Sequence, residues 1–210
     1  LYSYPRFTWQ TVIPDQRRIS KIDLSDDYLQ AIRLYASCAD ELKSSELYRN
    51  DLIEFVSYYV AAKAENFYKQ ALKDDSENRV LAAQRNLQQT VDLLMDVDKL
   101  LASHPLYRLE EWVELARNSG TTLQEKDAYE ANAKRLITSW GGIQEDYAAR
   151  FWSGLIKDYY IPRIQLYFTK GRNKIREWEE QWITSPWSNS TTPFDDPVEA
   201  ALNLIEKTNK

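Results

Sequence analysis

The stretch that decides the fold runs from Tyr48 to Leu72 and reads YRNDLIEFVSYYVAAKAENFYKQAL. Its apolar residues recur mostly three and four positions apart, which is the period of one face of an α-helix. A helix with so broad an apolar face lies at the centre of a domain. The sequence therefore predicts a central helix over 48–72. Its apolar face consists of Leu52, Phe55, Val56, Tyr59, Val60, Phe67, Tyr68, Ala71 and Leu72.

Helical periodicity continues on both sides of this stretch. Upstream, a helix is expected to begin at Ser25, whose hydroxyl can cap it. Downstream, a polar break at 73–78 precedes a third long helix, which ends before Pro105 because proline disfavours helix in the residue before it. Three antiparallel helices with short connections define a bundle. The apolar face of the upstream helix is Tyr28, Ile32, Tyr35, Ala39 and Leu42.

The rest of the chain continues the helical pattern. Shorter helices are expected over about 109–117, 123–139 and 146–160, with an interruption at Pro162 and a further helix to about Ile183. After a loop over 185–197, Asp196 caps a last helix with Pro197 at its first position. The predicted fold is all-α, an irregular bundle of about six to eight helices. Residues 1–20 show no helical period and are expected to form an extended lead-in, followed by a single helical domain over 21–210.

Composition excludes several classes of protein. The 210 residues carry 27 Lys and Arg against 32 Asp and Glu, a net charge of −5 that gives no electrostatic reason to expect a nucleic-acid partner. No stretch approaches the roughly 18 apolar residues of a membrane span. One Cys and one His exclude an intrachain disulfide and the commonest zinc sites. No cofactor or metal is implied. The chain begins with Leu1 and no signal pattern, so we expect a processed product or a fragment.

Single reactive side chains favour structural roles. His104 lies at a helix end, where a structural role is more common than catalysis. Cys38 lies near an apolar face and is expected to be a core thiol. Ser153 is expected in mid-helix without the glycine that precedes the serine of a nucleophile elbow.

Carboxylates are plentiful, but their spacing selects no catalytic pair. Hydrolysis of a sugar needs two carboxyl groups about 5 to 9 Å apart. Adjacent residues on a helix point about 100° apart, and we expect the adjacent acidic residues to face solvent. These are Asp26-Asp27, Asp74-Asp75, Glu110-Glu111 and Glu179-Glu180.

The densest aromatic signal lies between Trp140 and Phe168. One interpretation is core packing, with Tyr147, Phe151, Leu155 and Tyr159 spaced four apart on one helix and Arg163 paired to a nearby acid. The other starts from Trp140, which a Trp-Gly-Gly turn brings to the end of a helix, where function is often located. A flat aromatic ring presented there can stack on the C–H face of a sugar. The residues alone leave both interpretations open.

This run resembles the C-terminal helical domain of the α-N-acetylglucosaminidases, retaining glycoside hydrolases that remove terminal α-linked N-acetylglucosamine. The likeness extends from the region of Arg6 through Phe168, and includes the helix start at 48–52 and the stretch from Tyr58 to Tyr68. Two departures are Ile164, where the family usually has Trp, and a spacer of only four residues between Trp-Gly and Asp-Tyr. The matching motifs are Trp140-Gly141, Asp146-Tyr147-Ala148, Trp152-Ser153-Gly154-Leu155, Tyr159-Tyr160 and Pro162-Arg163.

The resemblance implies a division of labour. In this family both catalytic carboxylates belong to a preceding (β/α)₈ barrel, so no catalytic residue is expected in this chain. Trp140 and Ile143 would line the sugar pocket, Gly141 would let the backbone turn, and Tyr147 would support that turn. The implied partners are the upstream barrel of the same polypeptide and a glycan, in a periplasmic, secreted or lysosomal setting. The alternative is a freestanding helical module that binds a protein or glycan without catalysis.

Overall fold

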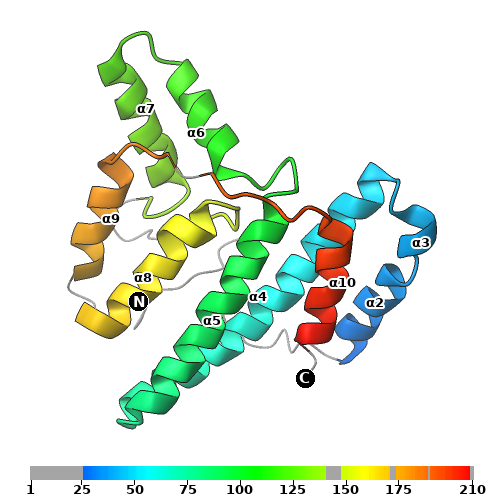
Figure 1. Ribbon diagram of the computed structural model, residues 1–210. Helices are drawn as coiled ribbons and strands as arrows, with labels where there is room; N and C mark the ends of the chain where they lie inside the picture. Colours follow the sequence, from blue (N-terminus) through cyan, green and yellow to red (C-terminus); the bar gives the residue numbers. More distant parts are fainter. Residues whose placement is uncertain (1–25, 141–147, 171–173, 189, 209–210) are drawn as a thin grey trace. The chain divides into compact units, whose positions relative to one another are not determined.

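A computed structural model describes residues 26–140, 148–170, 174–188 and 190–208 (Figure 1). These residues contain eight helices of seven residues or longer and no strand, which confirms the all-α prediction. None of the described helices is long and apolar enough to cross a membrane. In chain order the helices are α2 (Asp26–Ala36), α3 (Ala39–Leu42), α4 (Glu46–Ser76), α5 (Val80–Leu101), α6 (Leu109–Asn118), α7 (Leu123–Leu136), the π-helical turn η3 (Ile156–Tyr160), α8 (Ile161–Lys170), α9 (Ile175–Thr184) and α10 (Pro197–Lys207).

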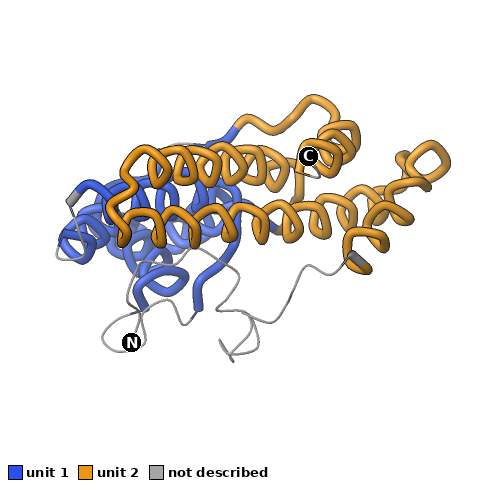
Figure 2. The backbone as a smooth tube through the Cα atoms, turned by 90° about the horizontal axis from the view of Figure 1, so that it is seen from below, with its two compact units in different colours: residues 1–20, 107–191 blue, residues 21–106, 192–210 orange. Residues whose placement is uncertain are grey.

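The described residues form two compact units (Figure 2). Unit 1 comprises those from Tyr107 to Thr191, and unit 2 comprises those before Tyr107 together with those after Thr191. Residues 1–20 lie outside the described residues. The extended lead-in and the single domain over 21–210 therefore stay predictions.

Unit 2 is built on the antiparallel pair α4 and α5, with α2 and α10 packed on α4 (Figure 1). The Ser45 hydroxyl caps α4 by accepting the N–H of Tyr48 at 3.4 Å. The predicted central helix is confirmed and extends to Ser76. The interior of this pair is mainly apolar, although Ser57, Thr90 and Asp98 are also buried in it. Its most buried apolar side chains, at 2% exposure or less, include Leu52, Val56, Tyr59, Val60, Leu94, Val97 and Leu100.

The first predicted helix is divided into two. It ends at Ala36 and resumes as α3 at Ala39, so the apolar face does not continue and Leu42 is 42% exposed. Cys38 lies in the break, where it is exposed. The prediction that Cys38 is a core thiol is therefore wrong, because the helix whose face would have buried it ends two residues earlier.

Asp74 is buried, although an adjacent acidic pair was expected to face solvent. It accepts hydrogen bonds from Arg79, Gln70 and Asn86, which together close the turn between α4 and α5. The hydrogen bonds from Arg79 are the main reason that the pKa of Asp74 lies below its usual value. The expectation failed because two of the three partners of Asp74, Arg79 and Asn86, lie on the turn and on the next helix, outside the pattern of α4 itself.

His104 has the structural role that was expected of it. It is 5% exposed, and its Nδ1 accepts the N–H of Leu106 at 3.0 Å. Burial lowers the pKa of its imidazole. The side chain thus holds the turn that follows α5.

Unit 1 contains the hairpin of α6 and α7, with α9 packed against both α7 and α8 (Figure 1). A capping box starts α7: the Thr122 hydroxyl accepts the N–H of Glu125, and the Glu125 carboxylate accepts the N–H of Thr122. The helix ends at Leu136, three residues before the predicted Ser139.

The predicted helix over 146–160 is wrong for its first part. Residues 149–152 are not helical, and Ser153 forms a parallel bridge with Arg108. The Ser153 N–H donates to Tyr107 O at 2.8 Å, and Gly154 adopts the left-handed φ of 82° that glycine accommodates. Helix cannot form here because these backbone groups pair with another segment. Ser153 is therefore not in mid-helix, and Phe151 is buried without belonging to a helical stripe.

The irregularity expected at Pro162 occurs one turn earlier. The π-helical turn η3 runs directly into α8, and Pro162 lies in the first turn of α8. The Ile161 N–H bonds the Ile156 carbonyl in the wider π-helical pattern, directly before the proline, which has no N–H to donate. The C-terminal loop and the last helix are confirmed, with Asp196 accepting the N–H groups of Val198 and Glu199.

Candidate functional site

Trp140 follows the end of α7 in an unusual backbone conformation. Its φ is 52°, in the left-handed region that glycine favours and that costs other residues about 1–3 kcal/mol. Its N–H donates to the Arg135 carbonyl at 2.9 Å, which closes the turn. The side chain is 37% exposed. Trp140 therefore stands at the surface of unit 1 and is not a core residue, and strain of this kind is often found at functional sites.

The turn that carries Trp140 is tied to α7 and α9 by side chains. The buried Thr138 donates from its hydroxyl to the Lys134 carbonyl at 2.7 Å. Five residues before Trp140, the Arg135 guanidinium donates to both carboxylate oxygens of Glu180 on α9, at 2.8 and 2.6 Å. Hydrogen bonding to Arg135 lowers the pKa of Glu180. The end of α7 is thus fixed against α9.

A buried charged cluster centred on Glu130 lies deeper in unit 1. Glu130 accepts from Lys134 and from Arg117 of α6, the latter at 2.6 Å, and from the backbone N–H of Trp187. Lys134 is 1% exposed, and its ammonium also donates to Ser185 O and lies 4.7 Å from the centre of the Trp182 ring. Burial lowers the pKa of Lys134. The cluster joins α6, α7, α9 and the following loop.

Glu179 is the second buried acid of unit 1. It lies 2.7 Å from Arg163 of α8 and accepts the Tyr159 hydroxyl at 2.9 Å. The predicted pairing of Arg163 to a nearby acid is confirmed. The expectation that Glu179 faces solvent is wrong, because its partners come from α8 and η3.

These buried carboxylates are poorly suited to acid–base catalysis. Asp74, Glu130 and Glu179 each form an ion pair with an arginine or lysine. Hydrogen bonding from Arg79 lowers the pKa of Asp74, whereas a general acid needs a raised pKa. Their arrangement fits structural ion pairs. Among the described residues, no group of three or more His, Cys, Asp or Glu side chains could hold a metal ion.

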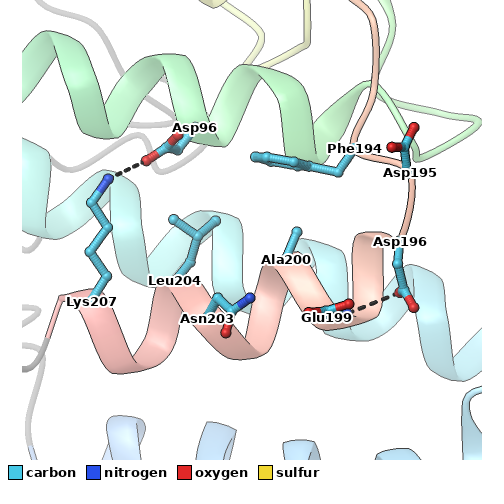
Figure 3. A pocket seen from close by; sticks show the side chains of 9 residues that line it. All are labelled: Asp96, Phe194, Asp195, Asp196, Glu199, Ala200, Asn203, Leu204 and Lys207. Carbon is cyan, nitrogen blue, oxygen red and sulfur yellow. Dashed lines mark hydrogen bonds and ion pairs between the residues drawn. The ribbon is translucent and has the colours of Figure 1, made fainter.

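A hollow of about 370 Å³ lies beside α10 in unit 2 (Figure 3). Figure 3 shows Lys207 reaching Asp96 of α5, a pair 2.7 Å apart, while Asp196 caps α10. The ion pair between Lys207 and Asp96 attaches α10 to α5, and Asp196 caps the first turn of α10. Phe194 contributes apolar surface to the hollow, and Lys99 lies 5.8 Å from the centre of its ring.

Trp140 is the one sequence-predicted site residue that the described part of the chain contains. Gly141, Ile143 and Tyr147 lie outside the described residues. Ile164, where the resemblance departs from the family pattern, is fully buried in α8 and so packs inside unit 1. The pairing of Arg135 with Glu180 could not be predicted from the sequence, since nothing in the spacing of two charges 45 residues apart indicates that they meet.

The sequence model of the α-N-acetylglucosaminidase (NAGLU) C-terminal domain matches residues 4–207. The chain belongs to this family. Because the match extends over nearly the whole chain, it favours a C-terminal helical domain of an α-N-acetylglucosaminidase-like glycoside hydrolase over a freestanding helical module.

Curated and solved relatives agree with this family. The chain is 31% identical to human α-N-acetylglucosaminidase over 144 residues, which are 67% of this chain and 19% of the human protein. A family 89 glycoside hydrolase from Clostridium perfringens, solved in complex with PUGNAc, matches 85% of this chain with a TM-score of 0.73 and 22% identity, over 23% of its own length. The same enzyme in complex with its substrate GlcNAc-alpha-1,4-galactose gives a TM-score of 0.71 at the same identity and coverage. The chain thus spans about a fifth of the length of these relatives, and it shares the fold of the matched part of the Clostridium perfringens enzyme.

Proposed function

We propose that this chain packs against the catalytic barrel of an α-N-acetylglucosaminidase and lines one side of its substrate cleft with Trp140. The observation that carries the proposal is an exposed tryptophan held at positive φ, in a domain of this family. The substrate class is a glycan that ends in α-linked N-acetylglucosamine. The two catalytic carboxylates belong to the barrel, as in the family the sequence resembles.

An exposed indole suits this role for physical reasons. A sugar ring presents a face of C–H groups, and a flat aromatic surface can stack on it while it excludes water from that side. Holding the sugar in a productive orientation lowers the barrier to reaction, because less orientational freedom is lost on reaching the transition state. Ile143 would extend the same wall, while Gly141 and Tyr147 would support the turn.

The setting of the parent enzyme is part of the proposal. Human α-N-acetylglucosaminidase is among the relatives of this chain, and by analogy with the family we place the parent enzyme in a lysosomal, periplasmic or secreted environment. Fractionation of the source cells with the enzyme assay tests this assignment. Activity confined to the cytosolic fraction would contradict it.

The test is the Trp140→Ala change in the full-length enzyme that contains this chain. We expect kcat/KM on an aryl α-N-acetylglucosaminide to fall about tenfold or more through lost positioning of the sugar. Trp140→Phe keeps an aromatic face and should retain most of the activity. Leu123→Ala is the matched control, because Leu123 is an exposed apolar residue at the other end of α7. Unchanged kinetics for Trp140→Ala would overturn the proposal.

The isolated 210-residue chain should fold and hydrolyse nothing. Circular dichroism should show mainly helix, and the same aryl substrate should give no turnover. Measurable turnover by the purified chain would contradict the assignment of the catalytic carboxylates to a barrel.

A further inference from the structure

We infer that Arg135, through its ion pair with Glu180, is a positioning residue that sets the orientation of the Trp140 ring for the sugar. This inference rests on the proposed function and names two residues that act on the same site through Trp140. Neither side chain is placed in contact with the substrate.

Arg135 acts on Trp140 through both its backbone and its side chain. Its carbonyl accepts the Trp140 N–H at 2.9 Å and the Thr138 N–H at 3.3 Å, so the whole turn closes onto this one residue. Its guanidinium forms two parallel hydrogen bonds with Glu180, at 2.8 and 2.6 Å. A movement of Arg135 relative to α9 is therefore transmitted directly to the backbone of Trp140.

The ion pair between Arg135 and Glu180 can fix the orientation of Arg135 because it consists of two hydrogen bonds. Two parallel hydrogen bonds between planar groups fix both distance and angle, whereas a single ammonium contact fixes distance alone. A tryptophan with positive φ also persists only where the surrounding structure constrains its backbone. The pair supplies such a constraint from α9.

Folding does not depend on this pair. The side chains of Arg135 and Glu180 are 36% and 54% exposed, and pairs so exposed contribute little to stability. The neighbouring Lys134, which is buried and bonded to Glu130 and to the Ser185 carbonyl, holds α7 in place instead. Removal of the exposed pair should leave a folded domain with a less constrained Trp140.

The experiment is a double-mutant cycle in the full-length enzyme. We expect Arg135→Ala and Glu180→Gln each to lower kcat/KM about threefold to tenfold with almost unchanged melting temperatures. In the Trp140→Ala background the same changes should have no further effect, because the ring that they orient is gone. The charge-exchanged variant Arg135→Glu/Glu180→Arg should have much of the wild-type activity, because the ion pair can form again. Arg135→Lys should keep only part of the wild-type activity.

Glu177→Gln is the matched control, since Glu177 forms an exposed ion pair with Lys174 at the start of the same helix. It should leave kcat/KM unchanged. If Trp140→Ala lowers kcat/KM while Arg135→Ala and Glu180→Gln do not, the inference is wrong and the proposed function stands. A loss that is as large in the Trp140→Ala background as in the wild type also overturns the inference, because the pair would then act on something other than Trp140. No effect of Trp140→Ala itself would overturn both.

Discussion

The α4 and α5 pair of unit 2 and the α7 and α9 pair of unit 1 are held together by different interactions. On α4 and α5 the buried side chains are mainly aliphatic and aromatic, although the acids Glu65, Asp74 and Asp98 are buried there as well. Around α7 and α9 the buried groups include Glu130, Lys134 and Thr138, each with a polar partner. Apolar packing tolerates substitution of similar volume, whereas a buried charge depends on each of its partners.

This difference has a functional consequence. A polar cluster fixes angles as well as distances, because hydrogen bonds are directional and apolar contacts are not. The candidate site lies at the end of α7, where such directional contacts are concentrated. We therefore expect unit 2 to gain most of its stability from buried apolar surface area. In unit 1, we expect hydrogen bonds to fix the position of Trp140.

The largest expected effect comes from a cavity in the apolar pair. Leu94 on α5 is fully buried, so Leu94→Ala should lower the free energy of unfolding by about 4 kcal/mol through lost burial and the space left behind. Leu81→Ala on the same helix removes a side chain that is 80% exposed and should cost less than about 0.5 kcal/mol. Urea unfolding of the 210-residue chain, followed by circular dichroism, measures both. Similar losses for the two variants would show that α5 packs on a different face.

The next effect concerns the charged cluster. Glu130→Ala leaves Lys134 buried without its carboxylate and should cost about 3 kcal/mol. Lys134→Met should cost less, because Glu130 keeps Arg117 and the Trp187 N–H. In the double variant the loss should fall below the sum of the two single losses, since no unpaired ammonium remains. Strict additivity in urea unfolding would show that Glu130 and Lys134 do not depend on each other.

Much of unit 2 could be predicted from the sequence, and much less of unit 1. The apolar period of α4 gave its position, and Asp196 followed by Pro197 gave the start of α10, because both signals are local. The irregular backbone at Ser153 could not be predicted, since it depends on pairing with Arg108, far away in the sequence. The burial of Glu179 could not be predicted either, because it depends on Arg163 of another helix.

The candidate site, like the fold, could be predicted only in part from the sequence. The Trp-Gly-Gly pattern placed Trp140 at the end of a helix, where its side chain is 37% exposed, but the left-handed φ of Trp140 itself could not be predicted, because residues other than glycine seldom adopt it. Arg135 and Glu180 carry no local signal of pairing. The capping box at Thr122 and Glu125 did carry one, since Thr followed three residues later by Glu is a recognised helix start.

A smaller effect is expected in the irregular segment of unit 1. Gly154→Ala places a methyl group at positive φ, 3.3 Å from both Leu109 Cβ and Trp187 Cζ2, and should cost about 1–2 kcal/mol. Asn78→Gly is the control of opposite kind, because Asn78 has a φ of 58° that glycine adopts freely. It should leave the melting temperature unchanged or slightly higher. A harmless Gly154→Ala change would show that the backbone here adjusts easily.

The smallest effect is the pH dependence of the capping box that starts α7. Hydrogen bonds from the Thr121 hydroxyl, and then from the Thr122 and Thr121 N–H groups, lower the pKa of Glu125 from 4.5 to about 2. Because the pKa is lower in the folded state, the ionised carboxylate stabilises the fold above pH 4.5, and this contribution is lost as pH falls towards 2. Glu125→Gln should therefore melt below the wild type near neutral pH, and the difference in melting temperature should shrink over that window.

Thr122→Ala separates the charge of this box from its geometry. It removes the hydroxyl that accepts the Glu125 N–H at 3.2 Å, a neutral hydrogen bond worth about 1 kcal/mol at a helix start. Its effect on the melting temperature should persist at low pH, where that of Glu125→Gln disappears. If the Glu125→Gln difference instead stays constant down to pH 2, ionisation of Glu125 contributes nothing. The start of α7 would then be held by neutral hydrogen bonds, and the charged contacts of unit 1 would be confined to the Glu130 cluster and the end of the helix that carries Trp140.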